Sequence, residues 1–169
     1  MRTQDLLRAQ FEQAHGILEQ VIDDCDDEAL AHVAGGTVGS ISAIYAHLVY
    51  DEDGMMRGAG REDTVWESDG WAERTGLGEM SGRQTLEWAQ SPQNYDLAAL
   101  REYAQAVYSA TDAYLESLSD NDLAEEINTF GGKQERARFL GTTCLWHVTN
   151  HQGEISALKG VQGLKGLPF

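Results

Sequence analysis

Proline is nearly absent from this 169-residue chain, and this scarcity constrains the fold more than any other feature. Only two prolines occur, Pro92 and Pro168, so most of the sequence lacks the residue that breaks helices. Apolar residues recur every three or four positions along four long stretches, which predicts four amphipathic α-helices. We expect these helices at residues 3–25, 37–58, 95–118 and 138–159.

Four helices of this length predict an all-α fold, a four-helix bundle. The connection from Met56 to Pro92, between the second and third helices, is long enough for these two helices to run parallel. A structureless loop of this length is rare in a compact domain, so we expect a short helix over Leu86–Gln90 and a crossover anchored by Trp66 and Trp71. A second connection, centred on Gly131-Gly132, has the composition of a small hairpin.

The chain is strongly acidic, with 28 acidic and 12 basic residues and a formal net charge of −16. A surface this negative repels phosphate backbones and anionic lipids, so nucleic acid and membrane surfaces are poor candidate partners. The first residues lack the apolar core of a signal peptide, and no stretch approaches the roughly 18 apolar residues of a membrane span. We therefore expect a cytoplasmic protein.

The motif CLWHVTNHQGEISALKG, residues 144–160, places His147 and His151 one turn apart on the same helix face. Both lie in the apolar stripe of the last predicted helix, and buried imidazoles are costly unless something satisfies their nitrogens. Neutral imidazole is a good ligand for zinc, nickel, copper and iron. The pair alone leaves two interpretations open, a metal site and two core histidines bonded to carbonyls or water.

A third histidine, His47, favours the metal. It lies in the middle of the second predicted helix, where it can meet the pair across the bundle. Three protein ligands with open positions are the arrangement of a catalytic metal site, because structural sites fill all four positions with protein. Asp51, one turn after His47, is a partner that could orient an imidazole, a fourth ligand, or an exposed carboxylate of the acidic run Asp51-Glu52-Asp53.

Four other side chains are weaker candidates. Glu154, three residues after His151, could act as a base near the same site or pair with solvent at the surface. Cys144 is interpreted as a small core residue with a reduced thiol, and it is not paired with the distant Cys25. His15 and His32 are interpreted as surface histidines.

The segment AHLVYDED around His47, together with LWHVTNHQGEISALKG, resembles the DinB/YfiT-like superfamily, including its maleylpyruvate-isomerase-like branch. The resemblance covers nearly the whole chain, taken as one domain over residues 1–169. It implies an up-down-down-up four-helix bundle and a homodimer. It also implies a divalent metal ion, nickel or zinc, held by His47, His147 and His151.

The resemblance implies a divalent-metal-dependent enzyme acting on a small molecule. Some members are described as hydrolases, and others resemble S-transferases or isomerases that use a low-molecular-weight thiol. Between the two, the resemblance favours thiol transfer. Asp51 and Glu154 are the candidate catalytic residues. Gln152 departs from the family pattern, which often carries arginine there, so an anion-binding role at that position is in doubt. Four arginines of the crossover could instead hold a thiol cofactor's carboxylate: Arg57, Arg61, Arg74 and Arg83.

Two other functions compete with an enzyme. The chain could be a non-enzymatic stress protein that binds a metal or a small molecule, and a closed metal site would favour that function. It could also be a helical interaction module whose histidines are core residues. An open coordination position facing a cavity would favour catalysis.

Overall fold

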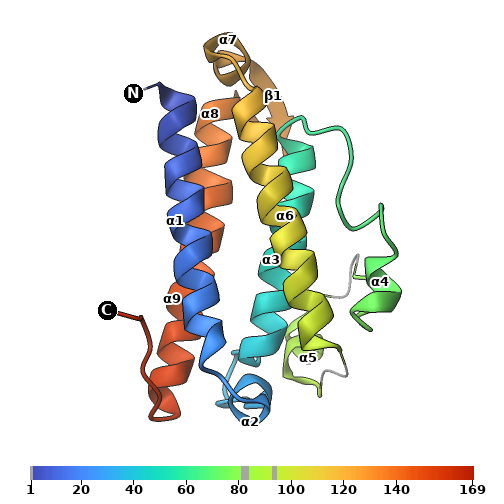
Figure 1. Ribbon diagram of the computed structural model, residues 1–169, viewed down its shortest axis with the longest axis vertical. Helices are drawn as coiled ribbons and strands as arrows, with labels where there is room; N and C mark the ends of the chain where they lie inside the picture. Colours follow the sequence, from blue (N-terminus) through green and yellow to red (C-terminus); the bar gives the residue numbers. More distant parts are fainter. Residues whose placement is uncertain (1, 81–83, 93–94) are drawn as a thin grey trace.

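The computed structural model describes residues 2–80, 84–92 and 95–169. Four long helices form the bundle that the sequence predicts, in up-down-down-up order (Figure 1). α1 and α9 run in one direction, and α3 and α6 run in the other. The helices are α1 (Thr3–Asp23), α3 (Ile41–Gly58), α6 (Leu97–Ser117) and α9 (Leu145–Val161).

Side-chain caps set where two of these helices begin. The Ser40 hydroxyl accepts a hydrogen bond from the backbone N–H of Ala43 and caps α3, and the Asp96 carboxylate caps α6 through Ala99. Each cap satisfies one of the backbone donors that a helix start leaves free. For this reason α3 begins four residues later than the predicted Thr37.

The helices pack in a square in which each has two main neighbours. α1 lies against α6 and α9, and α3 lies against the same two helices. The apolar stripes meet in one core cluster, in which Phe11, Leu48, Val107 and Ile155 are almost fully buried. α3 and α9 are therefore antiparallel neighbours, as a site shared between them requires.

The crossover between α3 and α6 is ordered by two short helices and by aromatic contacts. The helices are α4 (Trp71–Arg74) and α5 (Leu86–Gln90). Trp66 and Trp71 both contact the ring of Tyr103 on α6, as the sequence analysis expected. α5 is fixed at the start of α3, where the Ser40 N–H donates to the Ala89 carbonyl at 2.9 Å.

Short elements close the two ends of the bundle. α2 (Asp27–Ala31) follows α1 at one end, and α7 (Asp120–Ala124) precedes the hairpin at the other. The hairpin pairs β1 (Glu126–Thr129) with β2 (Gly132–Glu135) in antiparallel register, with Thr129 opposite Gly132. The predicted hairpin is confirmed, and its turn is Phe130-Gly131, one residue before the expected centre.

The last helical segment is not a uniform α-helix. It consists of α8 (Arg136–Phe139), the π-helical turn η1 (Leu140–Cys144) and α9. A π turn holds one extra residue and changes which side chains face the core, and such turns are frequent at functional sites. The change of register directly precedes His147.

Within the described part of the chain, no helix combines the length and the apolar character needed to cross a bilayer.

Candidate metal centre

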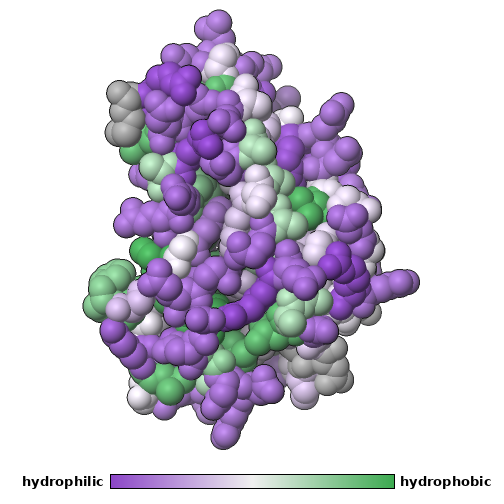
Figure 2. Space-filling view, viewed as in Figure 1, coloured by the Kyte–Doolittle hydropathy of each residue, from purple (hydrophilic) through white to green (hydrophobic). Residues whose placement is uncertain are grey.

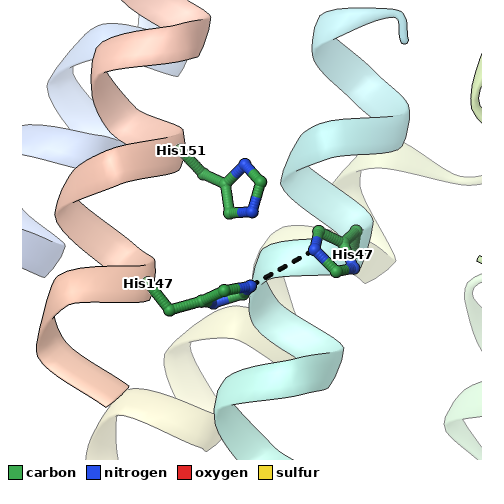
Figure 3. Close-up of side chains that lie close together, drawn as sticks. All are labelled: His47, His147 and His151. Carbon is green, nitrogen blue, oxygen red and sulfur yellow. Dashed lines mark hydrogen bonds between the residues drawn. The ribbon is translucent and has the colours of Figure 1, made fainter. Parts of the chain in front are cut away.

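The three histidines singled out by the sequence come together between α3 and α9. His47 projects from the middle of α3, and His147 and His151 project from successive turns of α9, so the rings point into the same space (Figure 3). One ring nitrogen from each of the three lies within 4.8 Å of the others. Among the described residues they form the only such group of possible metal ligands.

The separation of the nitrogens suits a shared ion. The Nε2 atoms of His47 and His147 are 3.2 Å apart. Two imidazole nitrogens that each lie about 2.1 Å from one tetrahedral zinc ion are separated by roughly 3.4 Å. This pair is therefore close to the spacing of two metal ligands, and a nitrogen of His151 lies within 4.8 Å of both.

Hydrogen bonds at the far side of two rings fix which nitrogen faces the centre. The Nδ1 atom of His151 lies 2.7 Å from the Glu154 carboxylate, and Nδ1 of His47 contacts the side-chain oxygen of Gln84. Both partner oxygens can only accept, so Nδ1 carries the proton in each neutral ring. The Nε2 lone pairs of His47 and His151 are then left free.

Gln84 is held in the required orientation by Asp51. Its amide nitrogen donates to the Asp51 carboxylate at 2.8 Å, and this leaves the amide oxygen to face His47. Asp51 also lies close to the rings itself, with one carboxylate oxygen 3.5 Å from His47 Nδ1 and 3.9 Å from His147 Nε2, although it is outside the mutually close group of three histidines. Gln84 itself was missed, because it lies in the crossover, where no helical periodicity indicates which side chains point inward.

His147 is the most buried of the three rings. Burial first, and then the neighbouring imidazoles of His151 and His47, lower the pKa of His147 to about 3. The ring is neutral at physiological pH and its Nε2 can act as a ligand. Its Nδ1 is buried and has no hydrogen-bond partner among the described residues.

These observations test whether the site fits a metal ion. Without a cation, ring nitrogens of the three histidines converge on one point. His47 and His151 already direct their Nδ1 protons to Gln84 and Glu154, so only His147 can donate a proton to another ring. The buried lone pairs are then under-satisfied, which is costly in a protein interior. A divalent cation that accepts from neutral imidazoles removes this deficit, so the residues present fit a metal.

One side of the cluster opens to a small cavity. The cavity has a volume of about 190 Å³ and is lined by His47, His151, Glu154 and residues of α5, among them Trp88. Neither Asp51 nor Glu154 belongs to the close group of ligand atoms. The arrangement is an open one, with three histidines that could hold a metal beside a space that can admit a small molecule.

The interpretation of His15 as a surface residue is wrong. His15 is only 7% exposed, and its Nε2 lies 2.9 Å from the carboxylate of Glu52, which is 1% exposed. His15 occupies the core side of α1 because it lies one turn after Phe11. The acidic run of α3 is likewise not a solvated face, since Glu52 and Asp53 are both buried. His32 is exposed, as expected.

Cys144 is buried, as predicted, and Cys25 is half-buried. Burial, with a smaller contribution from the charge of Glu52, raises the pKa of the Cys144 thiol. A neutral thiol is a poor metal ligand, so we assign Cys144 to the core, three residues before His147 in the same helical segment.

In a comparison with protein-family models, residues 10–155 match the model described as the DinB superfamily. No curated protein matches the chain.

Solved structures match over nearly the whole chain, at low sequence identity. A conserved protein from Enterococcus faecalis has a TM-score of 0.81 at 17% identity, covering 95% of this chain and 97% of the other. A DinB-like protein from Bacillus subtilis has a TM-score of 0.64 at 16% identity, covering 97% and 96%. The third structure is YfiT from Bacillus subtilis, described as a probable metal-dependent hydrolase with an unusual four-helix bundle topology. Its TM-score is 0.66 at 16% sequence identity, and the match covers 96% of this chain and 89% of the other. At these identities the likeness concerns the fold.

Proposed function

Because the chain belongs to the DinB superfamily, we propose that it is a metal-dependent hydrolase of a small molecule. The proposed ligands of the divalent metal ion are His47, His147 and His151. The observation that carries the proposal is the convergence of one ring nitrogen from each of three histidines beside a cavity of about 190 Å³. Nickel or zinc is the proposed ion, since both accept neutral imidazole ligands.

When bound, a divalent metal supplies Lewis-acid chemistry and lowers the pKa of the group that attacks the substrate. The protein supplies the rest. Glu154 hydrogen-bonds His151 through one oxygen and also lines the cavity, so it can orient the ring and hold a proton next to the substrate. Asp51 and Gln84 hold His47 in the tautomer that leaves Nε2 free.

Thiol-dependent transfer or isomerisation, which the family resemblance also implies, would use the same ligands with a different nucleophile. A thiol cofactor with carboxylates needs an available cation. Three of the four crossover arginines already pair with carboxylates: Arg57 with Glu67, Arg61 with Asp53 and Arg74 with Glu102. Arg83 lies outside the described residues. This pairing is the reason for placing hydrolysis first.

A non-enzymatic metal- or small-molecule-binding stress protein is the alternative from another class. A binding site of that kind gains affinity when protein ligands close it, whereas here a cavity borders two of the three rings. The open side favours catalysis.

Metal content of the purified protein, measured by elemental mass spectrometry, tests the proposal. We expect about one nickel or zinc ion per chain after incubation with the metal, and none in a His151→Ala variant. The matched control is His32→Ala, which removes an exposed histidine outside the site and should retain the ion. A wild-type protein that takes up no metal would overturn the proposed function.

If the protein takes up metal, assays of esters and amides with and without added thiol distinguish hydrolysis from thiol transfer.

We also propose that the chain forms one domain over residues 1–169 and is a homodimer, as the family resemblance implies, and that it acts in the cytoplasm. Sedimentation of the purified protein checks the dimer.

A further inference from the structure

A second cavity, separate from the histidine cluster, lies between α1 and α6. It has a volume of about 570 Å³, and small side chains, Ala9 on α1 and Ser109 on α6, leave room for it. α1 and α6 face the viewer in Figure 1, and most of the surface over them is hydrophilic in Figure 2. The histidine cluster lies between the other pair of helices, α3 and α9.

The inner wall of this groove contains the buried histidine of α1. The His15 ring stacks on Tyr108, with the ring centroids 3.9 Å apart and the planes 16° from parallel. Its Nε2 lies 2.9 Å from one oxygen of Glu52, and the Thr111 hydroxyl donates to the other oxygen at 2.7 Å. Stacking and hydrogen bonding together fix the orientation of the imidazole.

This arrangement determines what His15 offers to the groove. A carboxylate only accepts, so the neutral ring carries its proton on Nε2, next to Glu52. The other nitrogen, Nδ1, is then an acceptor. In the described part of the chain, Nδ1 has no hydrogen-bond partner, and it is not one of the fully buried polar atoms. His15 lines the groove, so Nδ1 is accessible from it. A ligand at this position must supply a hydrogen-bond donor.

The charges around the groove add a second requirement. The cation of Arg8 is already matched, because its guanidinium binds Asp112 at 2.7 Å and Glu116 at 3.2 Å. Glu12 also lines the groove and has no cationic partner among the described residues. It lies three residues before His15, so the two side chains are neighbours on one face of α1.

We infer that this groove binds a small organic ammonium ion, which donates N–H groups to His15 Nδ1 and to the Glu12 carboxylate. His15 Nδ1 requires a ligand that donates a hydrogen bond, and the Glu12 carboxylate favours a ligand with a positive charge. Neither a neutral alcohol nor an anion meets both requirements. A metal ion is a poorer fit, because the groove residues form no close group of three ligand atoms among the described residues. The net charge of −16 raises the local concentration of cations further.

Titration of the whole protein with butylamine and 1,4-diaminobutane tests the inference, with the ring ¹⁵N signals of His15 as the readout by NMR. We expect saturable shifts of the His15 signals, and affinity for the amine lowered about threefold to fivefold in Glu12→Gln. The matched control is Glu28→Gln, which removes the same charge from an exposed site on α2 and should leave affinity unchanged.

Tetramethylammonium separates a specific site from general attraction to an acidic protein. It carries the charge without an N–H donor, so it should not reproduce the shifts of the His15 ring. Equal binding by tetramethylammonium, equal affinity of the Glu12→Gln and Glu28→Gln variants, or the absence of saturable shifts would each overturn the inference. The measurement needs no metal, so its failure is independent of the proposed hydrolase function.

Discussion

Two polar clusters flank α3, and they satisfy their buried atoms in different ways. On the side of α1 and α6, Glu52 uses one oxygen for His15 and the other for Thr111. On the side of α9, His47 faces His147, an imidazole against an imidazole. In the first cluster the protein supplies both the hydrogen-bond donors, on His15 and Thr111, and the acceptor, Glu52. In the second cluster it supplies mainly imidazole nitrogens that accept hydrogen bonds.

The difference shows how a buried histidine that stabilises a fold can be told from one that binds a ligand. A buried polar group costs little when protein partners match it and a great deal when they do not. In the Glu52 cluster both carboxylate oxygens have hydrogen-bond partners, and in the described part of the chain His15 Nδ1 remains as an acceptor at the groove. The three-histidine cluster has its unmatched lone pairs directed at one point, which is the arrangement that a cation satisfies.

Removing Glu52 should produce the largest effect on stability. A Glu52→Leu substitution leaves the buried His15 Nε2 and the Thr111 hydroxyl without their acceptor, and breaking a buried pair in this way costs about 3–5 kcal/mol. Urea unfolding should show this loss. Metal uptake by the three histidines should persist, because Glu52 does not contact them.

The control for this prediction replaces the whole cluster. A triple variant with Glu52→Leu, His15→Leu and Thr111→Val removes every polar member and should recover most of the lost stability, since no unmatched group remains. A single Glu52→Leu variant that unfolds at the wild-type urea concentration would contradict a matched network. Loss of metal in that variant would show that the two clusters are coupled.

Gln84 should have the next largest effect, this time on metal affinity. A Gln84→Ala variant removes the oxygen that contacts Nδ1 of His47 and leaves only the Asp51 carboxylate, 3.5 Å away, so the ring is held less firmly in one tautomer. Loss of such an outer partner typically weakens metal binding about 10–100-fold. Competition with a chromophoric chelator measures the change. Gln90→Ala is the matched control, because Gln90 hydrogen-bonds the Gly36 and Val38 carbonyls and touches no histidine. Equal affinity of the two variants would rule out the positioning role.

The sequence predicted those parts of the fold that depend on periodicity. The helix ends differ from the predicted ends by a few residues, because caps such as Ser40 and Asp96 decide them locally. The three histidines could be identified because each lies on or beside an apolar stripe. His15 also lies on such a stripe, four residues after Phe11, and this spacing was the available signal that it is buried.

Other features depend on contacts between distant segments and could not be predicted from local pattern. The pairing of His15 with Glu52 joins residues 37 apart in sequence, and Gln84 reaches His47 from an irregular crossover. The π turn at Leu140–Cys144 was also missed. The predicted apolar stripe runs from Leu140 through Cys144 to His147 without a break, and π turns are rare, so the pattern gives little indication of one.

Replacing His147 by leucine should have the smallest effect and the opposite sign on stability. Among the residues that the structure describes, the substitution removes a buried Nδ1 atom without a partner and costs at most one hydrogen bond, to His47. Leucine has nearly the same volume. We therefore expect the unfolding free energy of the metal-free protein to rise by about 1 kcal/mol. Metal uptake should be lost, because one of three ligands is gone.

The opposite result would remove the distinction between the two clusters. If His147→Leu destabilised the metal-free protein by as much as Glu52→Leu, the three histidines would be matched core residues like His15, and no cation would be needed to explain them. His32→Leu serves as the control, since the same substitution at an exposed position should change the urea midpoint little. A gain in stability together with loss of metal is the combination that only a ligand-binding cluster gives, because selection has then kept an imidazole where leucine would fold better.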